Sequence, residues 1–153
     1  MINKFDTSYY TYSKDQYIYI GEKRSEFEMA LKKCTNGKVH YILDLSDCRN
    51  VNDLFIKVKR DYKFPNYFGN NYSAIGDCLM NYAYEGQVAF LEVINWQKYD
   101  KIDHASLYNF FDTLFFSAQE SKRLENINYY IYLDEIPDFK NPSIVMFKYN
   151  LVK

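Results

Sequence analysis

The hydrophobic positions along this chain follow two spacings that alternate with one another. Short apolar runs are typical of buried strands, and apolar residues recurring every three or four positions are typical of helices with one buried face. Strands are predicted within residues 7–20 and over 39–45, 88–94, 127–133 and 143–151, and helices over 22–34, from about 50 toward Pro65, for about 12 residues after 71, and over 105–120. This alternation predicts an α/β fold, a small sheet with parallel core strands flanked by helices.

The two central helices carry recognisable start and stop signals. Asparagine is a preferred N-cap residue, and Pro65 ends the first of these helices because the residue before a proline avoids the helical conformation. The candidate caps are Asn50 or Asn52 for the first helix and Asn70 or Asn71 for the second.

The second of these helices has a distinctive division of its faces. Its predicted inward stripe consists of Ile75, Cys78, Leu79 and Tyr82, which leaves Ser73, Gly76, Asp77 and Met80 for the opposite face. Before the helix, Tyr67 and Phe68 stand in a short turn, and at least one of the two rings is expected to face outward. Aromatic residues beside a central carboxylate are typical of an interaction hot spot. The alternative is an ordinary solvated aspartate with the rings packed under the loop.

Charge is distributed unevenly along the 153 residues. The chain has a net charge of −1, but residues 64–121 contain seven acids against two lysines, and no Lys or Arg occurs between Lys63 and Lys98. The rest of the chain therefore carries a positive excess. This asymmetry predicts a negative face directed at a positively charged partner, and it argues against binding to nucleic acid.

The length, the apolar runs and the cysteines limit the class of protein to which the chain can belong. The length predicts a single domain spanning 1–153, and no apolar run is long enough for a transmembrane helix or a signal sequence, so a cytoplasmic protein is expected. The three cysteines, Cys34, Cys48 and Cys78, lack a pairing or metal-binding pattern and are expected to be free thiols. No metal or other cofactor is expected.

Two other classes of function fit the sequence less well. A carboxylate-based hydrolase could use acids near strand ends, but phosphate loops and the usual nucleophile signatures are missing from the sequence. His40 is expected to be a packed strand residue, His104 to cap or precede a helix, and Glu92 to be hydrogen-bonded at its strand's end. A nucleic-acid-binding module would place exposed aromatics among positive charges, whereas these aromatics lie where positive charge is missing.

The stretch NVNDLFIKVKRDYKFPNYFGNNYSAIGDCL, which begins at Asn50, resembles the first helix, loop and second helix of the barstar family. The matching positions are Asp53-Leu54, Pro65, Tyr67-Phe68, Gly69, Asn71, Ala74 and Asp77-Cys78-Leu79, and VAFLEVINW resembles the family's middle strand. The resemblance covers about residues 39–134, with residues 1–38 and a final strand over 142–151 as extensions.

The resemblance implies a bacterial immunity protein, an antitoxin that inhibits a secreted nuclease, most simply a ribonuclease, rather than an enzyme. It implies that the loop and second helix enter the basic active site of that toxin, with Asp77 where a substrate phosphate would lie. The free protein is expected to be a monomer. The implied partner contacts are Tyr67, Phe68, Gly69, Asn71, Tyr72, Ser73, Gly76, Asp77, Met80 and Asn81.

Three of these positions depart from the family pattern. Ser73 stands where the family has an acid, Gly76 where it has a tryptophan, and Met80 where it has a small residue. The family's acid on the long helix corresponds to Asp112 or Thr113. A different cognate toxin is therefore expected, and a toxin that is not a ribonuclease stays open as an alternative.

Overall fold

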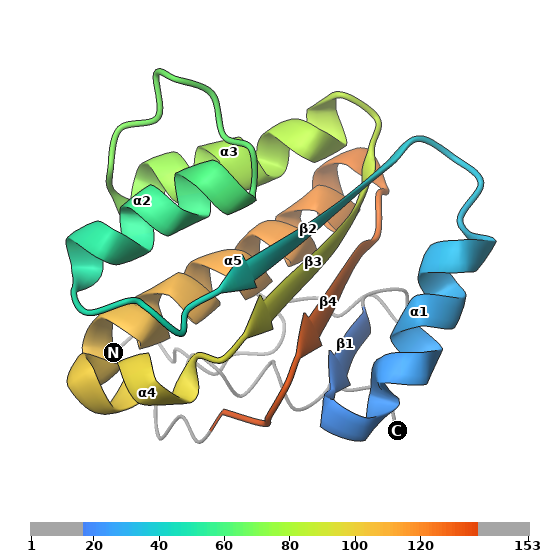
Figure 1. Cartoon of the computed structure of the whole chain (residues 1–153). Coiled ribbons are helices and arrows are strands. Elements are labelled where there is room, and N and C mark those ends of the chain that lie inside the picture. Colours follow the sequence, from blue (N-terminus) through green and yellow to red (C-terminus); the bar gives the residue numbers. More distant parts are fainter. Residues whose placement is uncertain (1–16, 138–153) are drawn as a thin grey trace, which may run out of the picture.

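The computed structural model describes residues 17–137, which form a four-stranded sheet with helices on both faces (Figure 1). In chain order the elements are β1 (Tyr17–Ile20), a 3-10 turn η1 (Gly21–Lys23), α1 (Arg24–Lys33), β2 (Lys38–Asp44), α2 (Val51–Asp61), α3 (Tyr72–Tyr84), β3 (Val88–Ile94), α4 (Gln97–Ile102), α5 (His104–Glu125) and β4 (Tyr129–Leu133). The predicted α/β class is confirmed. The predicted strand at 143–151 and most of the segment 7–20 lie outside the described residues.

The sheet is entirely parallel, with strand order β1-β4-β3-β2. In the central strand β3, Leu91 is in register with Tyr41 of β2 and with Ile131 of β4. Parallel neighbours need long crossover connections, and the helices supply them: α1 joins β1 to β2, α2 and α3 join β2 to β3, and α4 and α5 join β3 to β4.

Each face of the sheet has its own hydrophobic core. On one face, side chains of α2, α3 and α5 pack against alternate residues of the strands. This core includes Leu54 of α2, Ile75 of α3 and Leu91 of β3. On the other face Phe27 of α1 packs against Tyr19, Phe90 and Tyr132. The five central residues of β3 are all buried, as expected of the short apolar run at 88–94.

Glu92 lies within β3 rather than at its end, and its side chain faces α1. Its carboxylate accepts a hydrogen bond from Arg24 of α1 and contacts His40 Nε2 of the neighbouring strand at 2.5 Å. Glu92 is therefore hydrogen-bonded, as expected, but within the strand rather than at its end, because Arg24 approaches it from α1, 68 residues earlier in the chain. His40 is also exposed on its edge strand rather than packed in the interior.

Three buried tyrosines fasten α3 to the rest of the fold. The Tyr82 hydroxyl donates to the carbonyl of Tyr62, whose own hydroxyl donates to the Glu92 carbonyl at 2.9 Å. The Tyr129 hydroxyl donates to the Leu79 carbonyl and accepts from the Ala83 N–H at 3.0 Å. The backbone of α3 is thus fixed from its buried side.

The finer boundaries follow from local chemistry. The short helix α4 was not predicted, since six residues give too little apolar repetition to be recognised. Asp103 caps α5 by accepting from the Ser106 N–H, so His104 is the first residue of that helix and neither caps nor precedes it, contrary to the expectation. The helix runs past residue 120 and ends at Asn126, which adopts a left-handed conformation.

All three cysteines are free, as predicted, and two of them are buried. Burial raises the pKa of the Cys48 thiol to about 11 and also raises the pKa of the Cys78 thiol. Both therefore behave as small apolar core residues rather than as nucleophiles.

Candidate partner-binding surface

The loop between α2 and α3 presents one aromatic ring to solvent and buries the next. Tyr67 is 79% exposed, whereas Phe68 is 7% exposed and packs against Phe64 with a centroid distance of 5.3 Å. The Phe68 N–H donates to the Pro65 carbonyl at 3.0 Å, which closes the turn. The expectation that at least one ring faces outward is confirmed by Tyr67. Phe68 anchors the loop from inside, so its ring is not on the exposed surface.

Asn71 connects this loop to α3. Its Oδ1 accepts from the Ala74 N–H at 2.8 Å, which makes it the N-cap, and its Nδ2 donates to the Gly69 carbonyl. The cap thus satisfies a free helix N–H and fixes the path of the loop at the same time. Of the two candidates, Asn71 is the cap, just as Asn50 caps α2.

Asn71→Ala is expected to lower the free energy of unfolding by about 1 kcal/mol, because the helix loses its cap. Urea unfolding followed by circular dichroism measures this change. Asn70→Ala is the matched control, since the neighbouring asparagine is exposed and is not the cap. Equal effects of the two substitutions would contradict the role assigned to Asn71.

On α3, Asp77 is exposed on a helix whose other side is firmly packed. Ile75, Cys78, Leu79 and Tyr82 are all buried, as predicted. No ion pair or hydrogen bond joins the Asp77 carboxylate to another residue within 17–137. Its negative charge is therefore available to a group from outside the described part of the chain.

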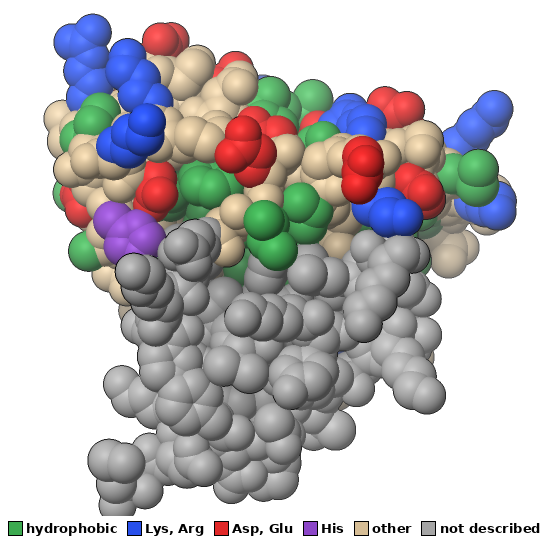
Figure 2. All heavy atoms as spheres, turned by 90° about the horizontal axis from the view of Figure 1, so that it is seen from below, with side chains coloured by type: hydrophobic (Ala, Val, Ile, Leu, Met, Phe, Trp, Pro, Cys, Tyr) green, Lys and Arg blue, Asp and Glu red, His purple; other side chains and the backbone are tan. Residues whose placement is uncertain are grey.

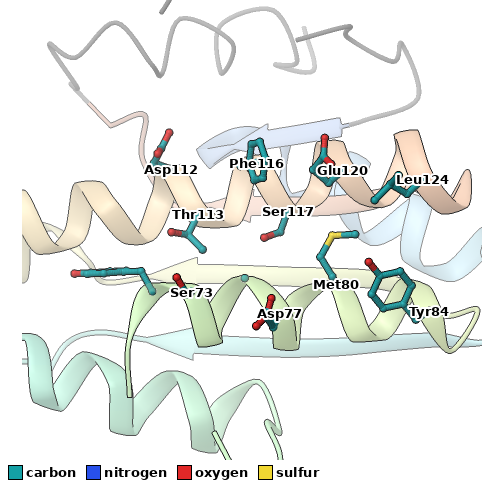
Figure 3. Close-up of a pocket in the computed structure, with 12 residues that line it drawn as sticks. Ser73, Asp77, Met80, Tyr84, Asp112, Thr113, Phe116, Ser117, Glu120 and Leu124 are labelled. Atoms are coloured by element: carbon teal, nitrogen blue, oxygen red, sulfur yellow. The ribbon is translucent and has the colours of Figure 1, made fainter. Parts of the chain in front are cut away.

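Two residues assigned to the outward face lie instead against α5. A Cβ added at Gly76 would lie 3.7 Å from Thr113 Cγ2 and 3.8 Å from Ser117 Oγ, and the Ser121 hydroxyl contacts Met80 Sδ at 3.3 Å. Figure 3 shows Met80 projecting toward α5 and Ser117 projecting toward α3. The near neighbour of Gly76 is therefore another helix of the chain itself. Helical periodicity could not reveal this because it does not say where a second helix will pack.

A groove of about 430 Å³ runs between α3 and α5 (Figure 3). Its lining residues are Tyr72, Ser73, Gly76, Asp77, Met80 and Tyr84 from α3, and Asp112, Thr113, Phe116, Ser117, Glu120 and Leu124 from α5. Five of the predicted contact residues, including Asp77, therefore line one depression. Tyr67 and Gly69 lie in the loop that leads into α3, outside this lining.

The groove is acidic. Its lining includes three carboxylates and no lysine, arginine or histidine, whereas acidic and basic side chains are interspersed on the described part of the face seen in Figure 2. Burial raises the pKa of the Asp112 carboxyl, and Glu120 is bound by Arg123 at 2.6 Å. The other candidate on α5, Thr113, donates its hydroxyl proton to the Asn109 carbonyl at 2.8 Å. Both candidates on α5 therefore line the groove, and Asp112 is the one that carries a carboxyl group.

Comparison with known families decides the relationship. The family model for barstar, the barnase inhibitor, matches residues 39–134, which is more than half of the chain. The chain belongs to the barstar family. Barstar proteins are inhibitors rather than enzymes, and membership suggests a role as a barnase-like ribonuclease inhibitor. A search of curated proteins finds no match.

Solved structures resemble this barstar-family chain in fold alone. A chain of the Aeropyrum pernix ORC2 protein in ADPNP-ADP complexes is 12% identical over 78% of this chain and 34% of its own, with a TM-score of 0.51. A chain in a structure of Drosophila ORC bound to DNA is 18% identical over 83% of this chain and 33% of its own, with a TM-score of 0.48. The chain spans about a third of the length of these solved chains.

Two further observations concern the described residues of this barstar-family chain. Within 17–137, histidine, cysteine and carboxylate side chains form no group of three or more that could hold a metal ion. The helices in that range are also too short or too polar to traverse a lipid bilayer.

Several groove residues were missed by sequence reasoning. Phe116, Glu120 and Leu124 recur every four residues along α5, and Tyr84 lies one turn beyond Met80 on α3. The spacing was visible in the sequence, but α5 is rich in Leu and Phe on several sides. An exposed stripe could not be separated from the buried one before the packing of α5 was known.

Proposed function

We propose that this chain is an immunity protein that binds a cognate bacterial nuclease toxin and covers its active site, with Asp77 in the position of a substrate phosphate. The observation that carries this proposal is the exposed Asp77 carboxylate without a partner among residues 17–137, on a helix fixed by buried contacts. A nuclease that cleaves RNA is the first choice for the toxin, because the family inhibits barnase. We further propose that the protein acts in the cytoplasm.

The physical basis is charge complementarity at a desolvated site. A nuclease cleft must hold a phosphodiester with arginine, lysine or histidine side chains, and a carboxylate forms short, charge-assisted hydrogen bonds with the same groups. Because α3 and the preceding loop are already ordered, little conformational entropy is lost when Asp77 enters such a cleft.

Residues around Asp77 supply the rest of the proposed contact surface. Exposed Tyr67 offers a large ring with few rotatable bonds, Ser73 lies one turn before Asp77, and Asn81 lies one turn after it. Gly69 and Asn71 shape the loop, and Tyr72 is held by a 3.0 Å bond from its hydroxyl to the Ser106 carbonyl. These three residues act mainly by positioning.

A toxin that is not a ribonuclease is the second candidate for the partner. It is favoured by the groove itself, since Gly76 lines the groove beside Asp77 at a position where the family pattern has a tryptophan. A toxin that fills the groove must have a projecting group of complementary shape.

Co-expression tests the proposal directly. The chain is produced in cells together with each nuclease encoded beside its gene, and growth is compared with and without the chain. Rescue of growth, together with recovery of a one-to-one complex by pull-down, is the expected result. Failure to rescue growth from every neighbouring nuclease would contradict an immunity role.

Association with the nuclease is expected to slow as ionic strength rises, since an acidic surface steers a basic partner over a range set by the Debye length. Stopped-flow measurements at low and at physiological salt report the association and dissociation rate constants separately. The dissociation rate is expected to change less than the association rate. An association rate independent of salt would show that the acidic surface has no part in the encounter.

A further inference from the structure

The part of the α3–α5 groove that runs from beside Asp77 toward the C-terminal end of α3 includes apolar side chains that the proposed inhibition by Asp77 does not use. Tyr84, Phe116 and Leu124 line it and are 57%, 47% and 49% exposed. These are three of the nine large hydrophobic residues that are exposed in the described chain. Scattered exposed hydrophobics need no explanation, but several in one groove mark an interaction site.

We propose that this part of the groove is a second subsite, which receives an apolar side chain of the nuclease that lies beside the cationic groups facing Asp77. The proposal rests on the proposed function for the identity of the partner. It adds the kind of residue that the partner must present, and it assigns partner recognition to α5 as well as to α3.

The floor of the groove explains why the space exists. Gly76 has no side chain, and an added Cβ would already reach van der Waals contact with Thr113 and Ser117. A larger residue at this position would therefore fill the space between the helices. Met80 forms the next part of the floor, and its flexible thioether adapts to apolar groups of different shape.

The charges around the subsite select the occupant. Asp77 and Asp112 have no hydrogen-bond or ion-pair partner among residues 17–137, and Glu120 is held by Arg123 at the side of the groove. An apolar group that carries an anion would be repelled, whereas one with a neighbouring cation gains from both features of the lining. The occupant is therefore an apolar side chain next to a lysine or arginine on a basic protein.

A small-molecule pair tests the chemistry without the nuclease. 4-Phenylbutylammonium has an apolar ring and a positive charge, and 4-phenylbutyrate has the same ring and a negative charge. In a two-dimensional NMR titration of the full chain at millimolar concentrations, the ammonium compound is expected to shift the resonances of Met80, Tyr84 and Phe116. The carboxylate compound is expected to leave them in place.

Variants of the groove provide the second part of the test. Phe116→Ser and Leu124→Ser are expected to weaken the ammonium response, and to weaken the nuclease complex about ten-fold or more, as expected for loss of an apolar anchor. Ile102→Ser is the matched control, because Ile102 is 50% exposed but lies on α4 outside the groove. Urea unfolding of each variant shows whether the fold is retained, and only folded variants are compared.

The outcomes separate the two proposals. If neither compound shifts the groove resonances, or if both do equally, the subsite inference is overturned. If Phe116→Ser leaves the nuclease affinity unchanged while Asp77→Ala abolishes it, the subsite fails and the proposed function stands. If the ammonium compound binds but no nuclease complex depends on Asp77, the proposed function fails. The result still shows that the groove prefers an apolar group beside a positive charge.

Discussion

Asp77→Ala is expected to weaken the nuclease complex by about 2–5 kcal/mol, the range found for truncated hydrogen-bonded charge pairs at interfaces, for which barnase–barstar is itself a source. This corresponds to roughly a 30- to 5,000-fold loss of affinity. Much of the loss arises because the cationic groups of the nuclease stay buried in the complex without their counter-charge. Isothermal titration calorimetry measures the dissociation constant and the enthalpy for both proteins.

A matched control distinguishes the effect of removing a negative charge at Asp77 from the effect of lowering the total negative charge of the protein. Glu26→Ala also removes one negative charge, but Glu26 is exposed on α1, which packs on the other face of the sheet from α3. This variant is expected to bind almost as tightly as the original chain. Because Asp77 is exposed and forms no hydrogen bond or ion pair within residues 17–137, its removal is also expected to leave the unfolding midpoint almost unchanged. Unchanged affinity of Asp77→Ala would reject the role proposed for this carboxylate.

Arg24→Ala is expected to lower the free energy of unfolding by about 3 kcal/mol, because it deprives a buried carboxylate of its principal counter-charge. Glu92 is 1% exposed, and its carboxylate is held between the Arg24 guanidinium and His40. The hydrogen bond to Glu92 raises the pKa of Arg24, so the guanidinium is charged at all working pH values. Arg24 also lies over the ring of Tyr132 at 4.8 Å from its centroid, and this contact is lost as well.

Urea unfolding at neutral pH measures this effect, and a double variant shows its origin. Arg24→Ala combined with Glu92→Gln is expected to be less destabilised than the sum of the two single variants, since no buried charge is then left unpaired. Lys23→Ala is the control, because Lys23 precedes α1 and its ion pair with Glu26, at 3.8 Å, lies at the surface, where such pairs contribute little. Additive effects in the double variant would contradict a pairwise interaction.

Much of the fold could be predicted from the sequence because its signals are local. The runs at 39–45 and 88–94 are mostly apolar and become β2 and β3, and the inward stripe of α3 repeats at helical spacing. Asn71 was one of two candidate caps, and only the geometry of its side chain separated it from Asn70. Local patterns thus predict most of the helices and strands and their order, whereas the exact residue at which a helix begins is determined only by the structure.

The features that could not be predicted depend on contacts between distant segments. Glu92 and Arg24 are far apart in the sequence, and nothing near either residue indicates the other. Gly76 and Met80 were assigned to the open side of α3 because periodicity describes one helix at a time, whereas α5 packs beside both. The groove and its apolar half exist only once two helices are placed together.

The attachment of α3 through its buried side has an evolutionary consequence. Tyrosine hydroxyls and the Asn71 cap hold the helix without help from Ser73 or Asp77, and the side chain of Met80 contributes a single hydroxyl contact. Substitutions at these positions can therefore accumulate at little cost to the scaffold. Proteins of this kind can therefore adapt to a toxin that changes by replacing a few outward residues, while the fold beneath them is conserved.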